Sequence, residues 1–202
     1  MKDKPLAIEN AHVLFIDVVG YSVLALDKQV QIQEWLKRIV RCTAGYRSTK
    51  KRRIVHCLPT GDGMALVIFR DPTVPTLVAV EISKALRAQT GFGIRIGLHS
   101  GPVRLVRDIN QRVNVAGHGV NLAQRVMDLG DAGHILVSNP VAECLQQMGG
   151  WSDYLHELGD FELVTGVRLR LFNLWSEAFG NPASPRRIAG AWDMHELTKA
   201  AA

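Results

Sequence analysis

The stretch that decides the fold runs His12-Val-Leu-Phe-Ile-Asp-Val-Val-Gly-Tyr-Ser22. It is a short apolar run that ends in an acid and is followed by a glycine turn. Beyond it, apolar residues recur at helical spacing from Leu24 to about Cys42. The stretch therefore predicts a core strand, a tight turn and a long amphipathic helix that packs on a sheet.

The rest of the chain continues this alternation of strands and helices. Asp62-Gly63 lies between two β-rich runs, which predicts a hairpin with Asp62 at its tip. The order of elements indicates an α/β (α+β) fold with a ferredoxin-like βαββαβ core and additional strands and helices. We expect residues 1–178 to form one domain and residues 179–202 to be a flexible tail or an interaction arm. The expected strands are 12–17, 54–58, 64–69, 92–99, 101–106, 134–137, 155–164 and 167–175, and the expected helices are 24–42, 77–86, 119–129 and 141–148.

The composition is that of an ordinary folded protein: 47% of the 202 residues are hydrophobic and 21% are charged. No window approaches the ~20 uninterrupted apolar residues of a membrane-spanning helix, and the N-terminal residues do not look like a secretory signal. We therefore expect a soluble, cytoplasmic protein. Cys42, Cys57 and Cys144 are widely spaced without a CxxC pair, which favours buried free thiols over disulfides or a zinc site.

The net charge of +5 equals the charge of one basic cluster, formed by Arg47, Lys50, Lys51, Arg52 and Arg53. Such a cluster is typical either of a nucleic-acid-binding patch or of a solvated loop between a helix and a strand. No aromatic residues interleave it, which favours the loop. We expect no nucleic-acid partner.

Two acids, Asp17 and Asp62, stand where expected strands end or turn. In a ferredoxin-like core the first strand and the hairpin lie side by side, so the two carboxylates converge on one edge. Converging carboxylates without histidines suit Mg²⁺ or Mn²⁺, which clamp phosphate oxygens and stabilise an in-line displacement. The turn after Asp17 precedes a helix, so the amide groups of Gly20, Tyr21 and Ser22 are candidates for binding phosphate.

Asn121 and Arg125 are four residues apart and therefore share one face of an expected helix. An amide and a guanidinium there can address one ligand, with the arginine neutralising charge that develops on phosphorus. Each candidate also has a plain structural interpretation: Asp17 as a helix cap, Asp62 as part of a hairpin turn, and Arg125 as a surface residue. The combination, rather than any single residue, favours the functional interpretation.

Four blocks of the sequence resemble, in order and spacing, the catalytic domain of the class III nucleotidyl cyclases. They are LFIDVVGYS (14–22), LPTGDGMALVIF (58–69), IRIGLHSGPV (94–103) and VAGHGVNLAQRV (115–126). The resemblance implies an enzyme with two divalent ions, Mn²⁺ or Mg²⁺, held by Asp17, Asp62 and the Val18 backbone. It also implies that Asn121 orients the ribose and that Arg125 stabilises the transition state. It further implies a head-to-tail homodimer with active sites at the subunit interface.

The chain departs from the adenylate cyclase pattern at the positions that read the purine, which hold Leu58 and Asn114. In this respect it resembles the stand-alone bacterial pyrimidine cyclases of anti-phage signalling. That resemblance implies UTP, then CTP, as substrate, and a cyclic-nucleotide effector protein as partner. Two alternatives remain open: an adenylate or guanylate cyclase with an unusual base pocket, and an inactive pseudo-cyclase that binds nucleotide.

Three later residues, Arg168, Arg170 and His99, also bear on this site. The family often has a late lysine that binds the triphosphate. It is missing from Leu163-Val-Thr-Gly166, and Arg168 or Arg170, which share one face of the next expected strand, is the candidate to replace it as a phosphate-binding residue. His99 is expected to be a core histidine rather than a catalytic base.

Overall fold

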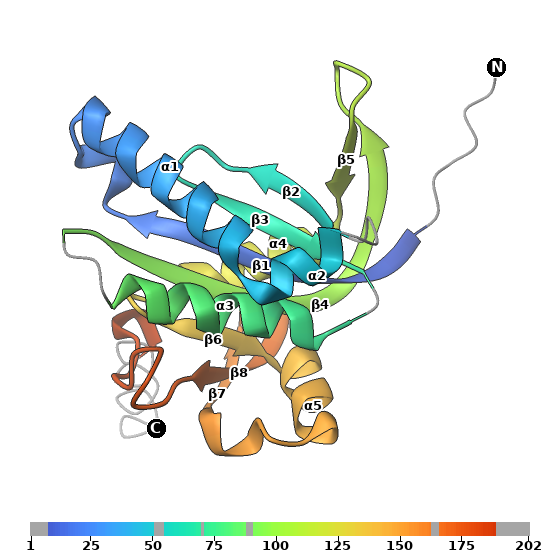
Figure 1. Ribbon diagram of the computed structural model, residues 1–202. Helices are drawn as coiled ribbons and strands as arrows, with labels where there is room; N and C mark the ends of the chain where they lie inside the picture. The colour runs from blue at the N-terminus through green and yellow to red at the C-terminus, as the bar shows by residue number, and fades with distance from the viewer. Residues whose placement is uncertain (1–7, 51–54, 70, 88–90, 163–165, 189–202) are drawn as a thin grey trace.

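The structure is a computed structural model that describes residues 8–50, 55–69, 71–87, 91–162 and 166–188. Within these residues the centre is an eight-stranded sheet in the order β2-β3-β1-β4-β6-β8-β7, and β5 pairs with β4 (Figure 1). Strands β4 and β6 run parallel, and the other pairs are antiparallel. The strands are β1 (Ile8–Val19), β2 (Val55–Pro59), β3 (Gly63–Ile68), β4 (Gly93–Arg107), β5 (Val113–Ala116), β6 (Ile135–Ser138), β7 (Leu155–Glu162) and β8 (Arg168–Leu174).

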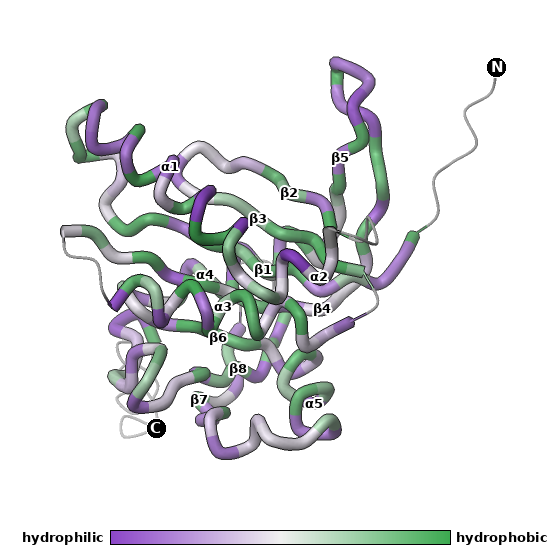
Figure 2. The backbone as a smooth tube through the Cα atoms, viewed as in Figure 1, coloured by the Kyte–Doolittle hydropathy of each residue, from purple (hydrophilic) through white to green (hydrophobic). Residues whose placement is uncertain are grey.

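Helices cover both faces of the sheet. The main hydrophobic core lies between the sheet and α1, α3 and α5, and α2 packs beside α3 on the same side. A smaller cluster lies on the opposite face, under α4. Figure 2 shows hydrophobic stretches along the central strands and α3. The helices are α1 (Leu26–Cys42), α2 (Ala44–Lys50), α3 (Thr73–Leu86), α4 (His118–Asp128) and α5 (Asn139–Met148), with single 3₁₀ turns η1 (Tyr21–Val23) and η2 (Ser152–Tyr154).

Strand β1 is central because it pairs with β3 on one side and β4 on the other. Its side chains alternate between the two faces, as they do in any strand. Leu14, Ile16 and Val18 enter the main core, whereas Val13 and Phe15 enter the cluster under α4. Asp17 follows this second set and so faces the α4 side of the sheet.

The prediction of a βαββαβ core with additional elements is confirmed, and most expected elements are present. The two strands expected at 92–99 and 101–106 are one strand, because β4 pairs with β1 continuously from Gly93 to Arg104. Helix α2 and strand β5 are additional, and both are short elements that depend on their neighbours. A Cβ at Gly45 of α2 would lie 2.7 Å from the Val78 side chain of α3, so this helix sits very close to its neighbour.

Two expectations are corrected, one about the basic cluster and one about the cysteines. Arg47 lies on α2 rather than in a loop, and it is exposed; residues 51–53 of the basic cluster lie outside the described residues. All three cysteines are free, but Cys42 and Cys57 are exposed and Cys144 is half-buried. Cys42 ends α1 and Cys57 lies on the edge strand β2, so neither is enclosed by neighbouring elements.

In the described part of the chain, none of the helices has both the length and the apolar character that crossing a bilayer requires.

Candidate active site

The pairing of β1 with β3 brings Asp17 and Asp62 together. Asp17 pairs with Gly63, so the preceding residue, Asp62, stands beside it. The Val18 N–H donates to the Asp62 carbonyl oxygen at 3.3 Å. A Cβ at position 63 would lie only 1.9 Å from the Ile16 carbonyl oxygen, so the close pairing requires glycine. The sequence-based prediction that the two acids converge agrees with this register.

Asp17 is a largely buried carboxylate, with 7% of the residue exposed. Burial raises the pKa of Asp17 above its usual value, and a hydrogen bond from Arg95 partly offsets that effect. The neighbouring Asp62 carboxyl raises the pKa of Asp17 further, because two close carboxylates repel each other. A cation between the two acids would relieve this repulsion.

The donor set fits a hard divalent cation. Mg²⁺ prefers oxygen ligands and is commonly held by one or two carboxylates, with water and substrate phosphates completing its shell. No group of three or more His, Cys, Asp or Glu side chains able to hold a metal occurs among the described residues. Asp17 and Asp62 would therefore hold an ion together with ligands from water and substrate.

Arg95 is a further site residue, which the sequence reasoning misses. Its Nε donates to Asp17 Oδ2 at 2.8 Å, and its Nη2 lies 3.2 Å from Asp128 Oδ1. Its Nη1 also donates to the Asp128 carbonyl oxygen at 3.2 Å. Arg95 pairs with Asp17 across β1 and β4. An arginine between two buried isoleucines, Ile94 and Ile96, is the signal that could have identified it.

The glycine turn after β1 lies beside the acid pair. Gly20 has a φ of 72°, a left-handed conformation that favours glycine, and it precedes η1. Tyr21 packs against the main core, whereas Ser22 is exposed. Of the three predicted phosphate-binding residues, Gly20 lines the same pocket as Asp17.

That pocket has a volume of about 520 Å³. Besides the end of β1 and the glycine turn, it is lined by Arg95, by the loop after α4 and by residues that follow β8. Its lining residues are Asp17, Val19, Gly20, Arg95, Gly130, Asp131, Arg186 and Arg187. A larger hollow of about 660 Å³ lies against α1, around Trp35 and Phe92, and neither Asp17 nor Asp62 lines it.

Asn121 and Arg125 lie on the exposed side of α4, whose opposite side packs on β4 and β1. Neither residue lines the pocket beside Asp17. Among the described residues, neither side chain has a hydrogen-bonding or ion-pairing partner, although the Asn121 backbone N–H donates to the Gly117 carbonyl oxygen at 3.3 Å. One chain therefore brings the two acids and Arg95 together, and presents the Asn/Arg pair on a separate surface.

Leu58 and Asn114 lie on β2 and β5, which approach each other on the α4 side of the sheet. Leu58 is half-buried against the cluster that contains Val115. The Asn114 side-chain oxygen accepts a hydrogen bond from the Val115 N–H at 2.8 Å, which leaves its amide nitrogen to donate elsewhere.

The late arginines are paired with acids of the neighbouring strand β7. Arg168 contacts Glu162 at 3.2 Å, and Arg170 contacts Asp160 at 3.0 Å. Strand β8 is separated from β1 by β4 and β6, and Arg168 does not line the pocket beside Asp17. The structure thus does not bring Arg168 together with the acid pair.

Comparison with known proteins finds one matching family model and several solved structures with a similar fold. A family model for the adenylate and guanylate cyclase catalytic domain matches residues 75–172. No curated protein matches the chain. The guanylate cyclase domain of RhGC from Catenaria anguillulae, solved in complex with GTP, is 22% identical, with a TM-score of 0.67 over 84% of this chain and 98% of its own. The adenylyl cyclase CyaB of P. aeruginosa is 15% identical, with a TM-score of 0.67 over 85% and 97%. An adenylate/guanylate cyclase/hydrolase from Silicibacter pomeroyi is 22% identical, with a TM-score of 0.65 over 85% and 99%.

Proposed function

The chain has the fold of the class III adenylate and guanylate cyclase catalytic domain, and we propose that it is a nucleotidyl cyclase. It converts a nucleoside triphosphate to a 3′,5′-cyclic nucleotide and pyrophosphate. The 3′-hydroxyl oxygen forms a bond to the α-phosphorus and loses its proton to solvent, while the bond from the α-phosphorus to the bridging oxygen breaks. The observation that carries the proposal is the Asp17–Asp62 pair beside Arg95 and a pocket large enough for a polyphosphate.

The residues of one chain account for metal and phosphate binding. Asp17, Asp62 and the Val18 backbone would hold two divalent cations, which on binding lower the pKa of the 3′-hydroxyl and neutralise phosphate oxygens. Arg95 faces the same pocket and adds positive charge next to Asp17. Gly20 allows the backbone of the turn to approach the phosphates closely. Positioning and electrostatics supply most of the catalysis in such phosphoryl transfers.

Asn121 and Arg125 complete the site from a second copy of the chain. Both are exposed on α4 and stand apart from the pocket of their own chain. In a head-to-tail homodimer, α4 of the partner would face the acid pair, so that Asn121 orients the ribose and Arg125 stabilises charge on phosphorus. Each dimer would then contain two equivalent sites.

We further propose that the substrate is a pyrimidine nucleotide, UTP before CTP. Leu58 cannot form a hydrogen bond with a base. A purine is recognised through hydrogen bonds to several of its atoms, so the loss of one such contact favours a smaller, pyrimidine base. The Asn114 oxygen already accepts the Val115 N–H, so its amide nitrogen is a donor for the base. Uracil presents a carbonyl at its 4-position, where cytosine presents an amino group. A donor at Asn114 therefore favours UTP.

A cyclic pyrimidine nucleotide made here would act as a second messenger for an effector protein that binds it, in anti-phage signalling. This part of the proposal rests on the resemblance to the stand-alone bacterial pyrimidine cyclases. The reaction would take place in the cytoplasm, where nucleoside triphosphates are made and consumed.

The test is to incubate the purified protein with Mn²⁺ and, separately, with ATP, GTP, CTP and UTP, and to identify products by mass spectrometry. Asp62→Asn is the control because it removes a metal-binding charge and keeps the shape of the side chain. Cyclic UMP that is absent from the control supports the full proposal. A cyclic purine nucleotide would support the proposed cyclase activity and refute the pyrimidine preference. No cyclic product from any of the four would refute the cyclase.

A further inference from the structure

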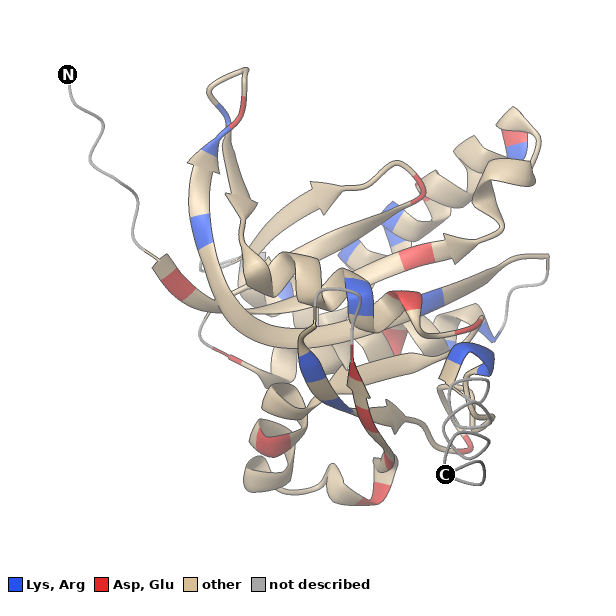
Figure 3. Ribbon diagram, turned by 180° about the vertical axis from the view of Figure 1, so that it is seen from behind, with Lys and Arg blue, Asp and Glu red and all other residues tan. Residues whose placement is uncertain are grey.

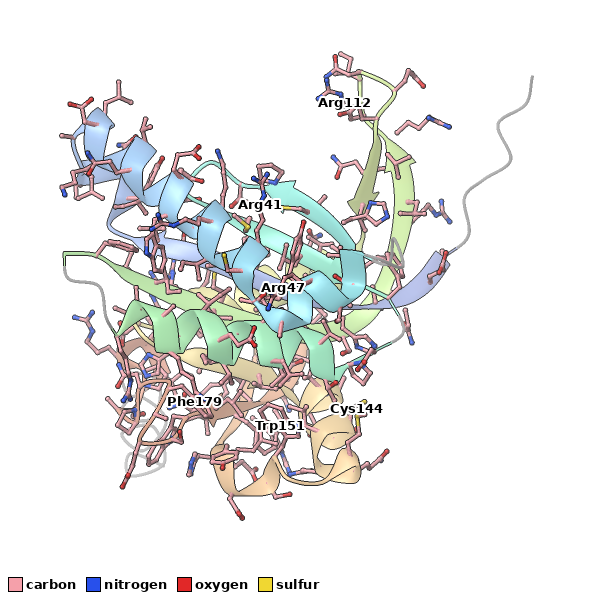
Figure 4. All side chains as sticks on the ribbon, viewed as in Figure 1. Arg41, Arg47, Arg112, Cys144, Trp151 and Phe179 are labelled. Atoms are coloured by element: carbon pink, nitrogen blue, oxygen red, sulfur yellow. The ribbon has the colours of Figure 1, made fainter. Side chains whose placement is uncertain are left out.

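The chain that follows β8 returns to the site. Residues 176–188, here called the C-terminal segment, are fixed at their start by Phe179, which is 5% exposed and meets the Tyr154 ring edge-on at 5.6 Å. Figure 4 labels Phe179 where this segment packs below α3. The Gly180 N–H donates to Ser83 Oγ of α3 at 2.9 Å. The segment is therefore part of the folded domain.

Further contacts tie the C-terminal segment to the loop between α4 and β6. Asn181 Nδ2 donates to the Ala132 carbonyl oxygen at 2.9 Å, and His134 Nε2 lies 2.8 Å from the Ala183 carbonyl oxygen. Ile188 is buried in a cluster with Val126, Leu136 and Leu171. These contacts hold the two residues before Ile188 at the mouth of the pocket beside Asp17.

Those two residues, Arg186 and Arg187, line that pocket. Arg186 donates from its backbone N–H to Asp131 Oδ2 at 2.8 Å and from Nε to Asp131 Oδ1 at 3.1 Å, and its Nη2 lies 3.0 Å from the same oxygen. Arg187 Nη1 donates to the Asp128 carbonyl oxygen at 2.6 Å, and this oxygen also accepts from Arg95. In Figure 3, basic positions at the end of the described chain lie beside acidic positions after α4.

We propose that Arg186 and Arg187 bind the phosphate groups of the substrate that leave as pyrophosphate, so that the C-terminal segment forms a second wall of the site. The inference rests on the proposed function, because it takes the bound polyphosphate to be that of a nucleoside triphosphate. It assigns to the C-terminal segment a role in substrate binding rather than one in packing alone.

The charge balance of the pocket supports an anionic ligand. Three arginines and two aspartates line it, and Asp17, one of the aspartates, would face a cation in the loaded site. The Arg186 side chain is 87% exposed despite its contacts with Asp131, so its guanidinium has room to turn towards a ligand. Arginine matches phosphate oxygens because it presents several N–H groups in one plane.

The test measures binding of inorganic tripolyphosphate to the full chain by calorimetry, with Mg²⁺ present. We expect the wild-type protein to bind, Arg187→Gln to bind about tenfold more weakly and the double variant Arg186→Gln/Arg187→Gln about a hundredfold more weakly, because each removes a charged hydrogen-bond donor. Arg47→Gln is the matched control, since Arg47 is exposed on α2 (Figure 4), and it should leave the affinity unchanged. Wild-type protein that does not bind, or variants that bind equally well, would overturn the inference.

A conservative variant separates phosphate binding from a purely structural role. Arg187→Lys keeps the charge, so we expect affinity within about threefold of wild type; binding as weak as that of Arg187→Gln would overturn the contact. Cyclic product formation is measured in parallel. If the Gln variants bind tripolyphosphate more weakly but no nucleotide gives a cyclic product, the proposed cyclase activity is refuted and the polyphosphate-binding site stands. Product formation with unchanged affinities would refute this inference alone.

Discussion

At the scale of single residues, Arg95 is the link between the acid pair and the end of α4. Its guanidinium contacts Asp17 and Asp128, and its side chain is only 19% exposed. Removing one member of a largely buried ion pair leaves the other charge without compensation. We predict that Arg95→Gln lowers the free energy of unfolding by about 2–4 kcal/mol, measured by urea denaturation.

The matched control for Arg95→Gln is Arg168→Gln. The Arg168 and Glu162 side chains are 80% and 57% exposed, so water screens their ion pair. Its loss should cost less than about 1 kcal/mol. Similar values for the two variants would contradict the central role of Arg95.

His99 is a core histidine, as the sequence analysis predicts, and it makes stability depend on pH. It is 2% exposed, and its Nδ1 lies 2.8 Å from Ser138 Oγ. Burial, with a smaller contribution from the charge of His118, lowers the pKa of His99 to about 4. Between that value and about 6.5, the unfolded chain binds a proton that the folded chain does not. The free energy of unfolding therefore does not depend on the protonation of His99 above about pH 6.5. As the pH falls from there towards 4, it decreases by about 3 kcal/mol in total.

We predict that His99→Asn removes up to one proton from this pH dependence. The free energy of unfolding of the wild type should fall more steeply between pH 6.5 and 4.5, by up to about 1.4 kcal/mol per pH unit, than that of the variant. Chemical denaturation at several pH values measures both slopes. Parallel slopes would mean that His99 is protonated in the folded protein.

Asn114 is the residue at which base preference can be tested. We predict that Asn114→Asp shifts the preference from UTP towards CTP by about 10- to 100-fold, since a carboxylate oxygen accepts from the cytosine amino group where the amide donates to uracil. The other carboxylate oxygen can still accept the Val115 N–H. Relative kcat/KM values for the two nucleotides measure the shift. An unchanged ratio of the kcat/KM values for UTP and CTP would show that Asn114 does not contact the base.

At the scale of elements, the position of α4 depends on one glycine of β4. A Cβ at Gly97 would lie 2.4 Å from the Met127 backbone nitrogen and 2.5 Å from the Ala123 carbonyl oxygen, both in α4. We predict that Gly97→Ala costs about 1–3 kcal/mol of stability and, by moving α4, lowers turnover more than the loss of folded protein explains. Denaturation and kcat measure the two effects.

Gly150→Asn is the control for this substitution. Gly150 has a φ of 75° and nothing within 4 Å of an added Cβ, and asparagine tolerates positive φ better than most residues. The Gly150→Asn variant should therefore retain the wild-type kcat. A Gly97→Ala protein with normal turnover would show that α4 can shift without effect on the reaction.

The elements differ in how far local sequence predicts them. The strand that carries Asp17 and the hairpin at Asp62 are predictable because their apolar patterns and turn residues are local. Local sequence can mark Arg95 only as an arginine between two isoleucines. Its contact with Asp17 is not predictable locally, because it depends on the pairing of β1 and β4, which are 78 residues apart at this point. The return of Arg186 to the pocket is set by a buried phenylalanine and a loop contact at Asp131, which carry no periodic signal.

At the scale of the whole molecule, the candidate residues of one chain fall on two surfaces. Asp17, which stands beside Asp62, lines one pocket together with Arg95, whereas Asn121 and Arg125 are exposed on α4. Large apolar residues are also exposed at the extremities: Leu26 at the start of α1 is 72% exposed, and Ile109 in the hairpin between β4 and β5 is 95% exposed (Figure 1). Single exposed apolar residues are normal on protein surfaces. The separation of the candidate residues onto two surfaces is therefore the feature that fits the proposed homodimer.

The proposed division of the site between two chains gives a prediction that no single-chain site shares. Asp17→Asn and Arg125→Ala should each be inactive, since each dimer then lacks one component of both its sites. In an equal mixture with free exchange, half of the dimers are mixed, and each mixed dimer has one intact site and one doubly altered site. We therefore expect about a quarter of wild-type activity from the mixture. Product formation is followed by mass spectrometry, and exchange is checked by native mass spectrometry of the mixed dimer. If mixed dimers form and the mixture stays inactive, each chain must build its site alone, and Arg125 must reach the phosphates by a movement of its own α4.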